Sequence, residues 1–155
     1  MKKLLLTLLL SCTFTIGIQA QEIFKEVKNM QKNAEAIAND TTKDIETRKV
    51  ACFKYDAIYY LIDKASQDET FTEYELGIQA NAMIDFVNLY VKRLSAEKKQ
   101  KNKELIKAKF RTATINNALF NDTDKEVIYG YVDNEKYITQ FSLDTNWVKA
   151  LEEVK

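Results

Sequence analysis

The residues with the most familiar catalytic spacing are Ser95 and Lys98, in the run Ser95-Ala96-Glu97-Lys98. This is the spacing of the serine and lysine in penicillin-binding enzymes, where a lysine one helical turn away activates the hydroxyl. The companion motifs of those enzymes are absent from this chain. A serine that caps a lysine-rich helix would give the same residue pattern, and we favour that interpretation.

Acidic residues alternate in Asp122-Thr123-Asp124-Lys125-Glu126, as they do in a calcium loop, and Asp133 falls at the twelfth place. Val127 stands at the sixth place, where a calcium loop needs glycine for its sharp turn. We therefore favour helix capping over a weak cation site. An enzyme built on carboxylates would use the pairs Glu73/Glu75 and Asp122/Asp124, and capping explains both pairs as well.

A basic stretch runs from Lys92 to Arg111, with nine basic and two acidic residues. The positive electrostatic potential of this stretch could attract an envelope polyanion or an acidic protein partner. We expect no nucleic acid, because aromatic residues do not alternate with the basic ones to stack bases. A run of charges is usually a solvated face, and we favour that interpretation over a binding patch. The candidate anion-binding residues are Lys92, Arg93, Lys99, Lys103 and Lys107.

Aromatic residues gather near the C-terminus, where short elements often leave aromatic surface uncovered. They offer a candidate ligand surface, with core packing as the alternative. The group comprises Tyr129, Tyr131, Tyr137, Phe141 and Trp147. Cys52 lies in the most apolar part of the chain, so we predict a buried, inert thiol there.

The chain has no histidine and no proline. Without histidine it lacks the usual general base near neutral pH and the commonest metal ligand, so we expect no cofactor and no metal site. Without proline, and with only three glycines, it has few sharp breaks, which favours long helices.

The N-terminus has the parts of a signal peptide: Met1-Lys2-Lys3, a leucine-rich run, and the small residue Ala20 at the exit. Cleavage there would remove two lysines and no acid, leaving 21 basic and 23 acidic residues and a net charge of −2. Leu9-Leu10-Ser11-Cys12 loosely resembles a lipobox, so lipidation of Cys12, which would place the protein on a membrane, is the alternative. We predict residues 1–20 as the signal peptide and export to the periplasm, the cell surface or the extracellular space.

Apolar residues recur every three or four positions and predict four main helices. The first carries an apolar stripe from Ile23 to Ile37. The second spans 42–65, starts at a capping box of Thr41 and Asp44, and is apolar around most of its circumference, so we place it in the middle of the bundle. The third starts at Thr72, with Glu75 closing its capping box, and the fourth is capped by Ser95.

Beyond residue 116 the pattern is ambiguous. Residues 124–143 fit either a short helix, which we favour, or a hairpin. A closing helix then runs through Trp147 and Leu151, introduced by Leu143-Asp144. We predict a single all-α domain over 21–155: a bundle of about four main helices with a short irregular C-terminal subdomain.

Three segments carry a family resemblance: Phe53-Lys54-Tyr55-Asp56-Ala57, Asn116-Asn117-Ala118-Leu119-Phe120, and Thr139-Gln140-Phe141-Ser142-Leu143-Asp144-Thr145-Asn146-Trp147. With Phe110-Arg111, they resemble a family of small exported helical proteins of Bacteroidetes. The resemblance implies export from a Gram-negative cell and a shared fold, and it transfers no functional residue.

These features together favour an exported, non-catalytic binding or interaction module of the cell envelope. The partner would be a protein or an envelope polyanion, with a membrane involved only if Cys12 is lipidated. A small envelope enzyme using carboxylates and a lipid-anchored structural protein are the alternatives.

Overall fold

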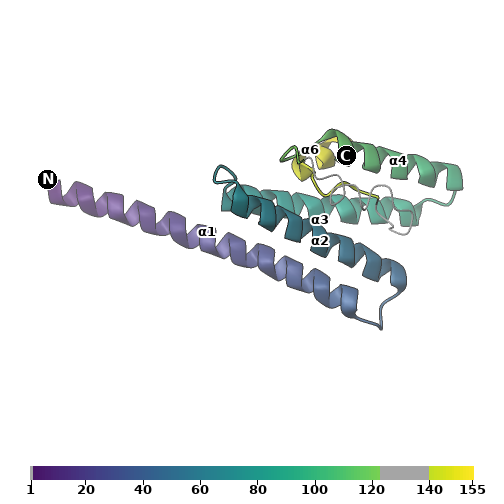
Figure 1. Cartoon of the computed structure of the whole chain (residues 1–155), viewed down its shortest axis with the longest axis horizontal. Helices are drawn as coiled ribbons and strands as arrows, with labels where there is room; N and C mark the ends of the chain where they lie inside the picture. Colours follow the sequence, from purple (N-terminus) through teal and green to yellow (C-terminus); the bar gives the residue numbers. More distant parts are fainter. Residues whose placement is uncertain (1, 123–139) are drawn as a thin grey trace.

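Five helices make up the described part of the chain (Figure 1). The computed structural model describes the backbone of residues 2–122 and 140–155, and the side chains of these residues from Gln21 onward. The helices are α1 (Lys2–Asn39), α2 (Ile45–Gln67), α3 (Glu73–Ala96), α4 (Gln100–Asn116) and α6 (Trp147–Val154). No strand occurs in the described ranges. The prediction of an all-α fold, with four main helices and a short closing helix, is confirmed.

The start of α3 is the clearest local signal, and it is confirmed. The Thr72 hydroxyl accepts a hydrogen bond from the backbone N–H of Glu75 at 3.2 Å. The Glu75 carboxylate accepts one in return from the backbone N–H of Thr72 at 2.8 Å. This capping box satisfies two backbone donors that would otherwise lack helical partners.

Two other predicted helix starts are wrong. α2 begins at Ile45 rather than Thr42, because Asp44 itself caps the helix by accepting from the backbone N–H of Thr47 at 2.9 Å. Ser95 does not cap α4, because α3 continues through it and its hydroxyl donates to the carbonyl of Lys92 at 3.1 Å. α4 starts at Gln100 without a side-chain cap.

The centre of the bundle is α3, and the placement of the second helix there is wrong. α3 packs against α1, α2, α4 and α6, whereas α2 packs along α1 and α3 and reaches α6 only through Phe53, whose ring lies edge-on to Trp147 at 6.0 Å. Figure 1 shows α1, α2 and α3 lying side by side, with α4 and α6 on the far side of α3. The outward side of α2 therefore has no cover from a described helix.

The core is an aromatic cluster between α2, α3 and the C-terminal segment. Phe86 of α3 contacts Phe141 and Trp147 edge-on, with ring centroids 5.2 Å and 5.5 Å away. Phe53 of α2 contacts Phe141 from the other side at 5.6 Å. Such edge-on pairs stabilise a core by more than the burial of their apolar area alone.

Residues 140–146 form an irregular strap that is fastened by buried polar groups. The Asp144 carboxylate, 3% exposed, accepts hydrogen bonds from the backbone N–H groups of Leu119, Phe120 and Asp122 at 2.8–3.1 Å. Asp144 thus ties the strap to the segment after α4, and Asn146 caps α6. The choice between helix and hairpin over 124–143 falls mostly on residues 123–139, which lie outside the described residues.

Candidate functional site

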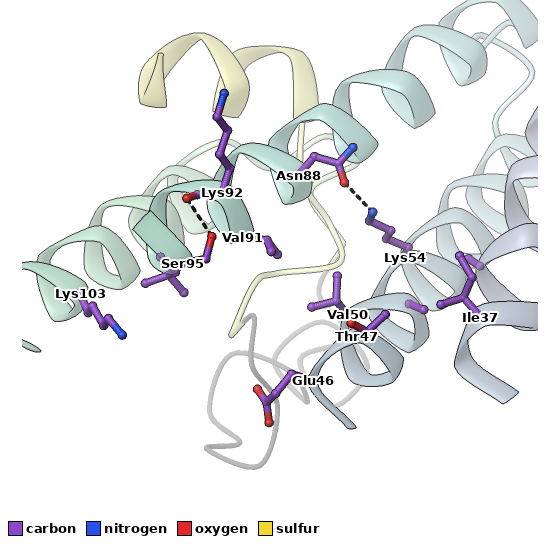
Figure 2. A pocket seen from close by; sticks show the side chains of 13 residues that line it. Ile37, Glu46, Thr47, Val50, Lys54, Asn88, Val91, Lys92, Ser95 and Lys103 are labelled. Carbon is purple, nitrogen blue, oxygen red and sulfur yellow. Dashed lines mark hydrogen bonds between the residues drawn. The ribbon is translucent and has the colours of Figure 1, made fainter. Parts of the chain in front are cut away.

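A groove lies where α1, α2, α3 and α4 approach one another (Figure 2). Its volume is about 690 Å³, within the range of pockets that hold small-molecule ligands. Four helices contribute to its lining: Ala34 and Ile37 from α1, Glu46, Thr47, Val50, Ala51 and Lys54 from α2, Asn88, Val91, Lys92, Leu94 and Ser95 from α3, and Lys103 from α4.

The walls of the groove are mainly apolar. Ile37 and Val91 are 40% and 39% exposed, although both line the groove from opposite sides. Ala51 is buried, and Val50 and Leu94 are half-buried. Large apolar side chains that face a hollow and stay accessible are the feature that distinguishes a binding surface from ordinary scattered surface residues.

Each wall follows from local helix geometry. On α2, Thr47, Val50, Ala51 and Lys54 recur at three- and four-residue spacing, which aligns them on one face. Ile37 belongs to the apolar stripe predicted for the first helix. It stays accessible at the end of that stripe because α2 begins only at Ile45, eight residues later.

One polar pair bridges the groove. The Lys54 ammonium on α2 donates a hydrogen bond to Oδ1 of Asn88 on α3 at 2.7 Å. Figure 2 shows this pair spanning the two helices, with Ile37 on one side of it and Val91 on the other. Burial lowers the pKa of Lys54, because removal from water disfavours its charged form. Among the described residues Lys54 forms no ion pair.

The lining of the groove carries more positive than negative charge. Lys54, Lys92 and Lys103 contribute three cations, and Glu46 is the only acid in the described lining. In Figure 2, Glu46 lies away from the Lys54 and Asn88 pair. The three lysines are not clustered: in Figure 2 the Lys92 side chain points away from Lys54, and Lys103 lies far from the Lys54 and Asn88 pair, so Lys54 is the cation beside the apolar walls.

The five candidate anion-binding residues do not form one patch. Lys92 and Lys103 line the groove. Arg93 donates to the carbonyl of Val154 at 2.6 Å, so it fastens the C-terminus. Lys107 pairs with Glu104 at 3.0 Å, and Lys99 is the residue before α4.

The aromatic ligand surface is wrong for two of its five residues. Phe141 and Trp147 are both 0% exposed and fill the core against Phe86. They are buried because the strap folds back onto α3, a long-range contact that no local pattern encodes. The other three, Tyr129, Tyr131 and Tyr137, lie outside the described residues.

The prediction of a buried Cys52 thiol is also wrong. Cys52 is exposed, as are Ile45 and Tyr59, which precede and follow it by seven residues on α2. This seven-residue spacing places the three side chains on one face of the helix. That face is the outward side of α2, which explains why an apolar sequence ends up accessible.

The described residues hold no candidate metal site. No group of three or more cysteine, aspartate or glutamate side chains among them could hold a metal ion. Of the predicted acid pairs, Glu75 is used in the capping box, and Asp122 pairs with Lys64 at 2.5 Å. Asp124 lies outside the described residues.

Sequence reasoning identified Lys92 and Lys103 but missed the other residues of the groove. Ile37 and Val91 look like ordinary members of apolar stripes, and Lys54 and Asn88 lie 34 residues apart on different helices. The available signal was a lysine in the largely apolar centre of the second helix, four residues after Val50 and three after Ala51. Only the packing of α2 against α3 shows what that lysine faces.

Comparison with known proteins adds no further information: no family model, no curated protein and no solved structure matches this chain. Within the described residues, no helix combines the length and the apolar character that crossing a bilayer requires.

Proposed function

We propose that this protein is an exported, non-catalytic binding module of the cell envelope, and that it holds an apolar small molecule in the groove between α1, α2, α3 and α4. The observation that carries the proposal is a groove of about 690 Å³ into which Ile37 and Val91 remain exposed from opposite walls. Burying these side chains against a ligand is favourable at roughly 25 cal/mol per Å² of apolar surface. Export rests on the signal-like residues 1–20.

A neutral, environment-sensitive dye such as N-phenyl-1-naphthylamine tests the proposal. Titrated into the purified protein, it should gain fluorescence in a saturable way as it enters the apolar groove. Val91→Asn should weaken the affinity several-fold, because it places an amide in the apolar wall. Ile37→Asn, from the opposite wall, should have the same effect.

Ile115→Asn is the matched control, since Ile115 on α4 is 37% exposed and lines none of the described pockets. Circular dichroism melts establish that each variant is folded. A dye signal that is absent, or that Val91→Asn and Ile115→Asn reduce equally, would refute the proposal.

A further inference from the structure

Lys54 is placed to meet a charged ligand inside the groove. It follows Val50 and Ala51 on the same face of α2, so its aliphatic stem lies in the apolar wall and its ammonium reaches Asn88. A lysine ammonium has three donor hydrogens, and the bond to Asn88 uses one. Among the described residues no carboxylate neutralises it.

An ammonium that is partly removed from water without an ionic partner is costly. Lys54 is half-buried, and this burial lowers its pKa. An anion bound beside Lys54 would offset this desolvation and accept hydrogen bonds from the remaining N–H groups of the ammonium. Lys92 follows Asn88 by one helical turn, but Figure 2 shows its side chain pointing away from Lys54, so Lys54 is the cation at this position.

The volume of the groove limits the size of the apolar part that such an anionic ligand can carry. At about 30 Å³ for a water-sized group, the groove has room for on the order of 20 non-hydrogen atoms. This is enough for one acyl chain of medium length and too little for the two chains of a membrane phospholipid. The walls beyond Lys54, formed by Val50, Leu94, Val91 and Ile37, offer such a chain an apolar path.

We propose that the groove binds a single-chain anionic amphiphile of the fatty-acid class, with its carboxylate against Lys54 and Asn88 and its hydrocarbon tail along Val91 and Ile37. This inference rests on the proposed function and adds the chemical class of the ligand. Lys54 supplies the charge, the Asn88 amide is the second polar group at that end, and the apolar walls supply most of the contact area.

Displacement of the bound dye by three amphiphiles of equal chain length tests the inference. These are dodecanoate, the neutral dodecanol and the cationic dodecyltrimethylammonium. Dodecanoate should compete at the lowest concentration and the cation at the highest. In Lys54→Met, dodecanoate should lose about tenfold in affinity, as expected when a hydrogen bond to a charged group is removed, while dodecanol is unaffected.

Lys101→Met is the matched control, because Lys101 is an exposed lysine of the same basic stretch and does not line the groove. It should leave the order of the three amphiphiles unchanged. Asn88→Leu is a second variant, which should weaken dodecanoate more than dodecanol.

The outcomes separate this inference from the proposed function. If dodecanol displaces the dye and dodecanoate competes no better, in the wild type and in Lys54→Met alike, the anionic class is refuted and the apolar site stands. Preferred binding of the cationic amphiphile would also refute it. If the dye itself does not bind, both proposals fail together.

Discussion

Asp144 is the residue whose replacement should most clearly reveal how the C-terminal strap is held. Its carboxylate is 3% exposed and accepts hydrogen bonds from three backbone N–H groups, those of Leu119, Phe120 and Asp122. Asp144→Ala removes all three acceptor contacts at once. The alanine side chain offers nothing in exchange, so the three donors must find water or stay unpaired.

The expected loss follows from the number of donors. A buried donor left without a partner costs about 1–3 kcal/mol. Leu119, Phe120 and Asp122 are half-buried, so water reaches part of this region and the lower bound applies to each donor. We therefore expect Asp144→Ala to lower the free energy of unfolding by about 3 kcal/mol, a large share of the 5–15 kcal/mol typical of a domain. Asp144→Asn keeps one acceptor oxygen and should cost about 1–2 kcal/mol.

Urea unfolding followed by circular dichroism measures the difference. Asp85→Ala is the control, because Asp85 is an exposed acid on α3 and its removal changes the net charge equally. It should shift stability by no more than about 0.5 kcal/mol. If Asp144→Ala is as mild as Asp85→Ala, or if Asp144→Asn is the more damaging of the two Asp144 variants, the carboxylate does not hold the strap as described.

Three further predictions concern the helices. A Cβ at Gly77 would come 2.7 Å from Cγ2 of Ile23, so Gly77→Ala should destabilise the protein by about 1 kcal/mol. In an Ile23→Ala background, where this clash is absent, Gly77→Ala should instead stabilise the protein by about 1 kcal/mol, because alanine has the higher helix propensity. Equal effects in the two backgrounds, measured by thermal unfolding, would contradict this contact. The exposed Cys52 should react with a maleimide in the folded state within about tenfold of its rate in urea, and labelling that requires unfolding would show that this face of α2 is covered. Hydrogen bonds from the backbone N–H and hydroxyl of Thr47 lower the pKa of Asp44 below its ordinary value of 3.8, so this cap should contribute stability above that pH and lose it as the pH falls through the folded pKa; an NMR titration of the Asp44 carboxyl that finds a midpoint at or above 3.8 would overturn the assignment.

Features that depend on neighbours within one or two helical turns could be predicted from the residues alone. The all-α class follows from apolar residues that recur every three or four positions, since this spacing forms one stripe on a helix. The start of α3 follows from Thr72 and Glu75, because a capping box is made within four residues. At the start of α2, Thr41 and Asp44 are both possible caps. The pattern predicted the helix start to within three residues but favoured Thr41, whereas Asp44 caps the helix.

The side of each helix that is covered depends on how distant segments pack, and it could not be predicted from local patterns. Phe141 and Trp147 belong to the C-terminal aromatic group that we predicted as a ligand surface, yet they are buried because the strap folds back onto α3. Cys52 lies in the most apolar stretch, yet it is exposed because no described helix packs on that side of α2. Lys54 acquires a role only where α2 meets Asn88 of α3. Burial is a property of contacts between segments far apart in the chain, and a periodic pattern shows that a face is apolar without showing what will cover it.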